Sequence, residues 1–464
     1  MPHDPVPALL SRSTELLEAQ FAALPAFASA ADAAAMAPIL DETARRLADN
    51  YPYFHPLYAG QMLKPPHPVA RAAYALAMTI NANNHARDGG RASSEMEIEA
   101  VRDLAAIFGW TEFLGHLTSG GTFANLEALW VAGQFAPGKR TVGSEQAHYT
   151  HQRISAVLKL DYTPIAADRR GRMSVAALED ELRKGDVGAV VVTLGTTAIG
   201  AVDPLDEILE LRKLYGFRVH VDGAYGGYFR LISEALDDPA RRAYAVLSQA
   251  DSIVIDPHKH GLQPYGCGCV LFRDPSVGRF YRHDSPYTYF TSSQLHLGEI
   301  SLECSRAGAS AVALWATQRL LPPVPGGEFA RGLARGRSAA IELDRRLRQD
   351  KASRFQPLAE GGPELDIVVW KMKAATPERA SELAQKIFAA CALRDLHLAL
   401  VELPLAWFEP ADGSETATGA AKVTCLRSVL MKPEHEAWLE EIWERLTAVC
   451  TDVLGEEEKC QQKQ

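Results

Sequence analysis

The chain has 464 residues, which exceeds one ordinary domain and predicts two closely packed domains or one large domain with appendages. Its apolar fraction of 47% and charged fraction of 23% suit a buried core under a normal polar surface. The formal net charge of -10 argues against a nucleic acid partner, because polyanion-binding proteins usually carry a basic surface. No uncharged apolar run approaches the roughly 20 residues that cross a bilayer, so no membrane partner is expected.

The seven cysteines are scattered along the chain and form no Cys-x-x-Cys pair. The sequence therefore indicates neither a metal site nor a disulfide framework, and it favours a reducing, cytoplasmic location. The Ala-rich stretch at residues 21–40 superficially resembles a targeting segment. Polar and proline residues interrupt it and no basic cluster precedes it, so no signal peptide is expected.

Residues 1–60 are predicted as a helical N-terminal segment. An apolar stripe at helical spacing runs from Leu9 to Phe21, and helical character returns from Asp41 to Leu47. The aromatic segment at residues 51–58 is twice interrupted by proline, which suits an ordered crossing at a surface or subunit contact. An amphipathic helix is expected at residues 95–108.

Residues 61–321 are predicted as a large domain in which short strands alternate with helices. Residues 187–194 are almost all apolar, as a strand buried on both faces must be, and a helix at residues 205–215 follows. Shorter apolar runs of the same kind are at residues 217–221, 252–255 and 269–272. This alternation predicts βαβ units, a mainly parallel sheet and an α/β fold.

Three prolines and two glycines at residues 322–327 mark the boundary to a smaller C-terminal domain, residues 322–464. Its predicted helices are at residues 329–348, 377–392 and 433–453. Its predicted strands are at residues 365–371 and 422–430. This combination predicts an α+β domain.

A Gly-rich turn precedes an apolar helix in Leu117-Thr-Ser-Gly-Gly-Thr-Phe-Ala-Asn125. Its two glycines and flanking hydroxyls present backbone N–H groups and a positive helix end, which suit a phosphate. An ordinary capped turn has the same composition, so this segment alone leaves both interpretations open. It matches neither a P-loop nor a dinucleotide-binding fingerprint.

Two further segments place charged side chains at the ends of buried strands, where ligands of open α/β sheets collect. Asp222 ends one strand, and a carboxylate there is costly unless a cation meets it; a turn-capping role is the alternative. Lys259 follows another strand between two histidines and is placed to lose its proton, as imine formation requires. His148 lies in a loop that leads into a helix, where a histidine by itself is more often structural.

In this order the four segments resemble the group II pyridoxal-phosphate-dependent amino acid decarboxylases, a family that includes aromatic-L-amino-acid, tyrosine and glutamate decarboxylases. The resemblance covers about residues 51–433 and is densest over residues 117–306. It implies fold type I, the aspartate-aminotransferase-like fold, with a mainly parallel seven-stranded sheet in the large domain and an α+β C-terminal domain. It also implies pyridoxal 5'-phosphate as the cofactor.

The resemblance further implies that Lys259 forms the imine with the cofactor, Asp222 pairs with its ring nitrogen and His148 stacks on the ring. The implied cofactor-binding residues are Gly121, Thr122, His148, Thr197, Asp222, Ala224, His258 and Lys259. The catalytic set adds Tyr289 as the mobile loop tyrosine of many decarboxylases, although Tyr287 in the same loop fits as well.

The implied function is decarboxylation of an L-amino acid by a homodimer with shared active sites. An aromatic substrate such as tyrosine is favoured and acidic amino acids come next. His260 and Gly261 after the lysine are reminiscent of sphingosine-phosphate lyases. Asp256 stands where some members of the family carry asparagine. Because a carboxylate should avoid the cofactor phosphate, Asp256 is expected to have a supporting role only. A carbon–carbon lyase or an oxygen-using deaminase therefore stays open, as does a catalytically inactive scaffold. Arg427 is predicted to form a surface ion pair rather than to meet a substrate carboxylate.

Overall fold

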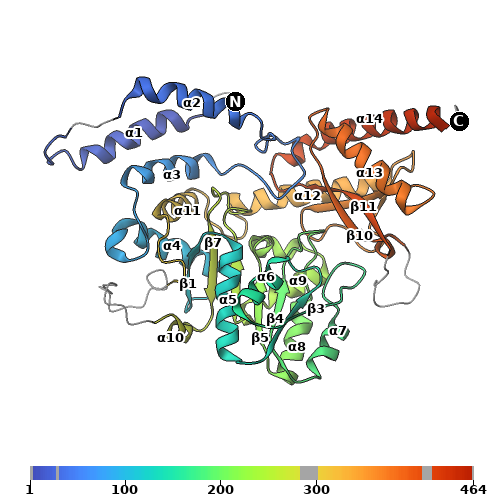
Figure 1. Cartoon of the computed structure of the whole chain (residues 1–464), viewed down its shortest axis with the longest axis horizontal. Helices are drawn as coiled ribbons and strands as arrows, with labels where there is room; N and C mark the ends of the chain where they lie inside the picture. Colours follow the sequence, from blue (N-terminus) through green and yellow to red (C-terminus); the bar gives the residue numbers. More distant parts are fainter. Residues whose placement is uncertain (1–3, 28–30, 283–300, 410–420, 462–464) are drawn as a thin grey trace.

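The computed structural model describes residues 4–27, 31–282, 301–409 and 421–461. A seven-stranded sheet and a four-stranded sheet organise the chain, with helices packed around them (Figure 1). The strand order of the larger sheet is β1-β7-β6-β5-β4-β2-β3, and only the pairs made by β7 are antiparallel. Its strands are β1 (Leu114–Thr118), β2 (Arg140–Ser144), β3 (Tyr162–Ile165), β4 (Val187–Thr193), β5 (Arg218–Asp222), β6 (Ser252–Ile255) and β7 (Gly268–Phe272). The predicted seven-stranded, mainly parallel α/β architecture is confirmed.

Helices connect these strands and cover the larger sheet. They are α3 (Pro68–Ile80), α4 (Arg91–Ile107), α5 (Gly121–Phe135), α6 (Thr150–Leu158), α7 (Val175–Leu182), α8 (Leu205–Tyr215), α9 (Asp238–Ala245), α10 (Gly278–Tyr281) and α11 (Gly308–Leu320). Helix α8 lies where the sequence predicts it, because its ends carry clear signals. Acidic residues occupy its first turn, basic residues occupy its last turn, and Gly216 ends it with a φ of 69°.

Strands β1, β2 and β3 escape a prediction based on apolar runs because polar residues and glycines interrupt them. The clearest case is His116, which is fully buried in the middle of β1. Its Nε2 lies 2.8 Å from Oε2 of the equally buried Glu127, so the polar ring is satisfied inside the core. A tertiary contact therefore stabilises a strand that the local residue pattern does not predict.

The C-terminal region forms an antiparallel sheet in the order β10-β11-β9-β8. Its strands are β8 (Phe355–Pro357), β9 (Ile367–Met372), β10 (Ala399–Pro404) and β11 (Lys422–Val429). Its helices are α12 (Glu328–Arg348), α13 (Pro377–Ala392) and α14 (His435–Gln461). The predicted domain boundaries at residues 60/61 and 321/322 stay predictions.

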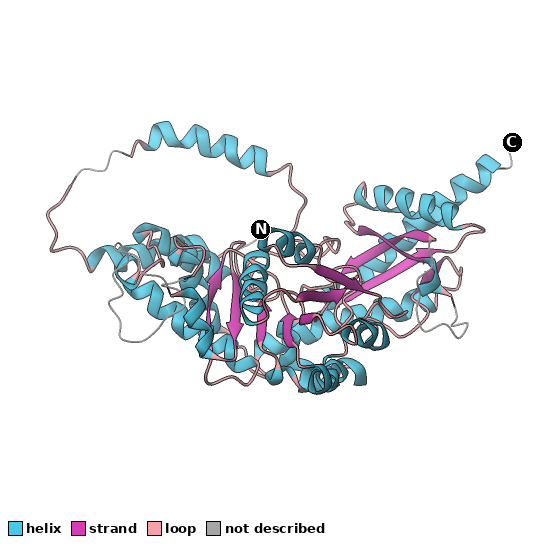
Figure 2. Ribbon diagram, turned by 60° about the horizontal axis from the view of Figure 1, so that its bottom comes forward, coloured by secondary structure: helices cyan, strands magenta, loops and turns pink. Residues whose placement is uncertain are grey.

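The N-terminal helices α1 (Val6–Ala19) and α2 (Ala33–Leu47) contain no buried residue. Helix α1 runs beside α3, whereas α2 stands apart from the rest of the chain (Figure 2). Helix α2 begins earlier than predicted because the Asp32 side chain caps it, accepting hydrogen bonds from the backbone N–H groups of Ala34 and Ala35. In the described ranges, no helix is both long and apolar enough to cross a membrane.

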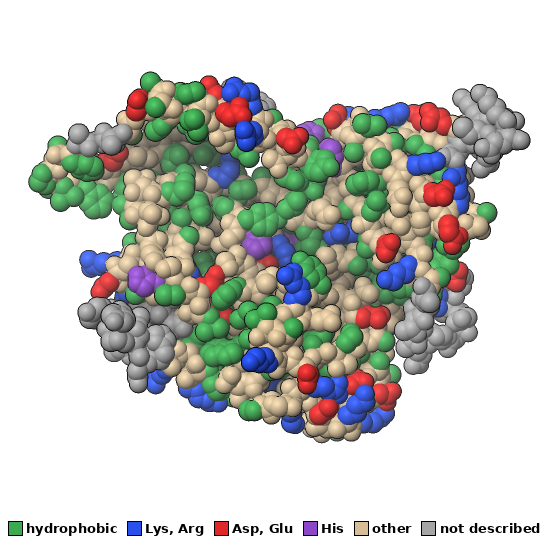
Figure 3. Space-filling model, in the orientation of Figure 1, with side chains coloured by type: hydrophobic (Ala, Val, Ile, Leu, Met, Phe, Trp, Pro, Cys, Tyr) green, Lys and Arg blue, Asp and Glu red, His purple; other side chains and the backbone are tan. Residues whose placement is uncertain are grey.

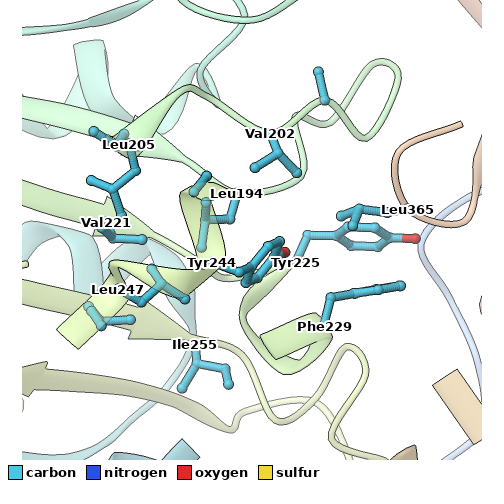
Figure 4. Packing of buried hydrophobic residues seen from close by; sticks show 14 of the residues in the cluster. Leu194, Val202, Leu205, Val221, Tyr225, Phe229, Tyr244, Leu247, Ile255 and Leu365 are labelled. Atoms are coloured by element: carbon cyan, nitrogen blue, oxygen red, sulfur yellow. The ribbon is translucent and has the colours of Figure 1, made fainter. Parts of the chain in front are cut away.

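The core packs against β4, β5 and β6 and includes Val221, Phe229 and Tyr244 (Figure 4). The Tyr244 hydroxyl donates a 2.7 Å hydrogen bond to the backbone oxygen of Gly226, in the turn that follows β5. A Cβ at Gly226 would collide with the backbone oxygen of Leu194, so this close approach requires glycine. The core thus fixes the turn that directly follows Asp222.

Candidate active site

A cleft of about 440 Å³ opens where β4, β5 and β6 end. This is the edge of a parallel sheet at which α/β proteins bind their ligands. The structure brings together here all the cofactor-binding residues that the sequence predicts, namely Gly121, Thr122, His148, Thr197, Asp222, Ala224, His258 and Lys259. Tyr287 and Tyr289 lie outside the described residues.

Lys259 reaches the cleft from the turn after β6. Its Nζ lies 3.2 Å from Oδ2 of Asp256, and its side chain is 23% exposed. The Asp256 carboxylate is almost fully buried, and its Oδ1 has no hydrogen-bond partner among the described residues. The amine is therefore held at the wall of the cleft by one carboxylate oxygen while remaining accessible to a ligand.

Asp222 ends β5 and presents a buried carboxylate to the same cleft. Its Oδ2 lies 2.7 Å from Nε2 of His151, and its Oδ1 accepts a 3.1 Å hydrogen bond from the backbone N–H of Ala224. Burial by itself raises the pKa of the Asp222 carboxyl, but the hydrogen bond from His151, the electrostatic interaction with His151 and the charge of Lys259 together outweigh it. The pKa is therefore held well below its ordinary value, so the cleft contains a fixed negative charge.

His148 lies just before α6 and lines the cleft. Its Nδ1 accepts a 3.3 Å hydrogen bond from the backbone N–H of Thr150, which fixes the ring. Burial lowers the pKa of His148, so the imidazole is neutral at neutral pH. A neutral, fixed ring is suited to lie against a flat aromatic ligand.

The Gly-rich turn at the start of α5 forms another wall of the cleft. Gly120 has a φ of 155°, and no side chain of the described residues caps the N-terminus of α5. A Cβ at Gly121 would lie 2.6 Å from Oδ2 of Asp256, so the close approach of this turn to Asp256 requires glycine. The turn is held from outside by Glu303, whose carboxylate accepts a 2.9 Å hydrogen bond from the backbone N–H of Ser119. It presents uncapped helix N–H groups to an anion.

The remaining predicted residues surround this turn. The Thr122 hydroxyl lies 3.2 Å from that of Thr150, which holds the starts of α5 and α6 together. The His258 ring packs against the Tyr265 ring with centroids 4.8 Å apart. Thr197 is exposed and lines the cleft.

The prediction that Arg427 forms a surface pair is wrong. The residue lies on β11 and is only 4% exposed, because the sheet and the segment at residues 58–61 cover it. Its Nη1 lies 3.5 Å from Oε1 of Gln61, while Nε and Nη2 have no hydrogen-bond partner among the described residues. Burial lowers the pKa of Arg427, although a guanidinium stays charged at neutral pH. A buried cation with unused donors suits an anionic ligand.

Sequence reasoning did not single out His151 or Tyr225. His151 follows His148 by three residues, but only the structure shows that it turns toward Asp222. Tyr225 lines the cleft and donates a 2.5 Å hydrogen bond to Oδ1 of Asp366, far along the chain. No local pattern signals either contact.

Comparisons with known proteins indicate the family to which this chain is related. Residues 138–357 match the family model described as the pyridoxal-dependent decarboxylase conserved domain. L-tyrosine decarboxylase of Enterococcus faecium is 28% identical over 76% of this chain and 75% of its own length. A probable L-tyrosine/L-aspartate decarboxylase of Methanothermobacter thermautotrophicus is 29% identical over 71% of this chain and 86% of its own length. The chain belongs to the group II pyridoxal-phosphate-dependent decarboxylase family.

The fold of this decarboxylase agrees with that assignment. The apo form of mouse CSAD aligns with a TM-score of 0.76, covering 94% of this chain and 91% of that one, at 20% identity. The predicted fold type I is thereby confirmed, as are the pyridoxal phosphate cofactor and the predicted reaction class, amino acid decarboxylation.

The cleft of this decarboxylase fits pyridoxal phosphate on its own geometry. The uncapped N–H groups at the start of α5, beside the Thr122 side chain in the wall of the cleft, match a phosphate. The fixed carboxylate of Asp222 matches a protonated pyridine nitrogen, and Lys259 supplies the amine that an aldehyde requires.

Proposed function

We propose that this enzyme decarboxylates an aromatic L-amino acid in the cleft, with Lys259 as the residue that holds the cofactor. The observation that carries the proposal is that Lys259, Asp222 and His148 line one cleft, although they come from three separate segments. The preference for an aromatic side chain is supported by the two relatives, whose names both include tyrosine. Aspartate in the second name makes acidic amino acids the next class.

The proposed chemistry divides between cofactor and protein. Bound pyridoxal phosphate supplies a sink for the electrons released at the substrate α-carbon. Asp222 holds the proton on the ring nitrogen, because its carboxylate stays ionised in the cleft. His148 fixes the plane of the ring, which selects the bond to be broken. Lys259 Nζ binds the aldehyde between turnovers and returns a proton to the α-carbon, a step for which Tyr289 or Tyr287 is also proposed.

The other predicted residues hold the cofactor in this proposal. Gly121 and Thr122 bind its phosphate at the start of α5, and Ala224 packs against its ring. Thr197 and His258 complete the wall of the cleft.

We propose that Arg427 binds the carboxylate of the substrate. Its buried Nε and Nη2 have no hydrogen-bond partner in the part of the chain that the structure describes, and Arg427 lies close enough to Tyr225, a cleft residue, for the two groups to interact electrostatically. Arg427→Met is expected to lower kcat/KM by about 10-fold to 100-fold, mainly through KM, because a hydrogen-bonded charge pair with substrate is lost. Steady-state kinetics with the preferred amino acid measures this.

The matched control for Arg427 is Arg337→Met. Arg337 lies on α12 and is also buried, but it donates to the backbone oxygens of Glu364 and Ala235 and is not among the described residues that line the cleft. It is expected to lower thermal stability without changing KM. An Arg427 variant with a wild-type KM would contradict the assignment.

We also propose that the chain forms a homodimer in which the N-terminal helices of each subunit pack against the other subunit. Many large apolar side chains of the first 47 residues are exposed (Figure 3). They are Leu9, Leu16, Phe21, Leu24, Phe27, Met36, Ile39, Leu40 and Leu47. A concentration of exposed apolar side chains on neighbouring helices indicates an interaction site, and family resemblance makes a second copy its occupant. A cytoplasmic location is part of the proposal and is supported by the scattered cysteines.

Deletion of residues 1–47 is expected to convert the dimer into a folded monomer, because α2 contributes nothing to the core of its own chain. Light scattering after size-exclusion chromatography measures the mass. The double substitution Ile39→Asp and Leu40→Asp should act in the same direction, whereas Glu42→Lys, at an exposed polar residue of α2, should not. A truncated protein that keeps the full-length oligomeric state would contradict the proposal that the N-terminal helices form the dimer contact.

A screen of amino acids for carbon dioxide release, with pyridoxal phosphate present, tests the proposed reaction. Stoichiometric carbon dioxide and amine, fastest with an aromatic substrate, are expected. Aldehyde or ammonia would favour an oxygen-using deaminase, and cleavage without carbon dioxide would favour a carbon–carbon lyase. Protein that stays colourless with the cofactor would favour an inactive scaffold.

A further inference from the structure

We propose that His151 is a positioning residue that keeps the Asp222 carboxylate ionised and oriented toward the ring nitrogen of the cofactor. The inference rests on the proposed pairing of Asp222 with that nitrogen and adds the residue on which the pairing depends.

His151 meets Asp222 inside the protein rather than in the cleft. It lies on α6 and is fully buried, with Nε2 2.7 Å from Oδ2 of Asp222. The other carboxylate oxygen accepts the backbone N–H of Ala224 at 3.1 Å. Two different segments therefore hold one oxygen each, which fixes the plane of the carboxylate.

The second nitrogen of His151 makes no competing hydrogen bond. Nδ1 is buried and has no hydrogen-bond partner among the described residues. Because a carboxylate oxygen only accepts, Nε2 is the donor in the contact with Asp222. Among the described residues, His151 therefore directs its side-chain hydrogen bond to Asp222 alone.

Loss of this donor has a definite consequence. A buried carboxylate without a hydrogen-bond donor favours its protonated form, since burial penalises the charge. A protonated Asp222 offers the ring nitrogen no anion, so the nitrogen loses its proton as well. The chain then holds the cofactor in a form that accepts electrons poorly.

A neighbouring histidine does not replace His151. The His220 ring is equally buried, with its centroid 6.3 Å from that of His151. Its Nε2 lies 2.7 Å from Asn125 Oδ1 and its Nδ1 lies 2.9 Å from Ser252 Oγ, so both nitrogens are committed elsewhere. Lys259 and His148 face Asp222 from the cleft, and His220 and Tyr162 also interact with it electrostatically.

The test measures the ring nitrogen in the resting holoenzyme. The enzyme is loaded with pyridoxal phosphate that carries ¹⁵N in the ring, and its nitrogen resonance is recorded at one neutral pH. Wild type should show the protonated position. His151→Phe should move the resonance toward the unprotonated position and lower kcat by about 10-fold to 100-fold with little change in KM, as loss of a hydrogen bond to a charge implies. His151→Gln keeps an N–H donor at similar reach and should restore both.

His220→Asn is the matched control, since it changes an equally buried histidine whose hydrogen bonds go to Ser252 and Asn125 and not to Asp222, and it should keep the wild-type resonance. If His151→Phe fails to retain the cofactor, His151→Met serves in its place. An unchanged resonance in the His151 variants, with a shifted one in Asp222→Asn, overturns the role of His151 alone. An unchanged resonance in Asp222→Asn as well overturns the proposed pairing itself.

Discussion

Lys259→Ala is expected to give a protein that forms no covalent link with pyridoxal phosphate and decarboxylates on the order of 10²–10⁴-fold more slowly. The reason is that Lys259 is the one lysine among the described residues that line the cleft. Its loss removes both the attachment point and a proton donor. The visible absorbance of the dialysed protein and the rate of amine formation measure the two effects.

Lys213→Ala is a suitable control, because Lys213 is exposed and pairs with Glu210 on α8, away from the residues that line the cleft. It should leave colour and rate unchanged. A Lys259→Ala protein that keeps its covalent colour after dialysis would show that another lysine holds the cofactor.

Asp222→Asn is expected to lower kcat by about 10²–10³-fold and to weaken cofactor binding. Asparagine has nearly the same shape but no charge, so the ring nitrogen loses its anionic partner. The pKa of Asp222 is held well below its ordinary value. Its carboxylate therefore stays ionised from neutral pH down past the ordinary aspartate range, and it should not produce the acid limb of the pH–rate profile. Kinetics and equilibrium titration with pyridoxal phosphate measure the effects.

Asp251→Asn provides the comparison for Asp222. Asp251 lies near the start of β6, where it binds the backbone N–H of Val219 and the side chain of Arg273, away from the cleft. It should reduce thermal stability and leave the cofactor affinity unchanged. Equal losses in the two variants would mean that Asp222 acts through stability and not through the cofactor.

The parts of the fold that the sequence predicts are those whose signals are local. Strand β4 is apolar throughout and buried throughout, and α8 is bounded by charges and a glycine. Strands β1, β2 and β3 carry polar residues whose partners come from elsewhere in the chain. His116 of β1, satisfied by Glu127 of α5, shows why no window of local sequence contains that information.

The residues of the candidate site likewise differ in whether local sequence predicts them. Lys259 and Asp222 are predictable because a charged residue at the end of an apolar strand is costly and requires a reason. The prediction of a surface position for Arg427 was wrong because its sequence neighbours do not show that β11 lies between β9 and β10. His151 was missed because its function is a contact with Asp222, which lies far away in the chain.

The most direct test of the account is to reduce the holoenzyme with borohydride and map the cofactor by peptide mass spectrometry. The reduced cofactor should be found on a single peptide, the one that contains Lys259. Its attachment to a lysine outside the cleft would contradict the central claim, that Lys259, Asp222 and His148 surround one bound ring.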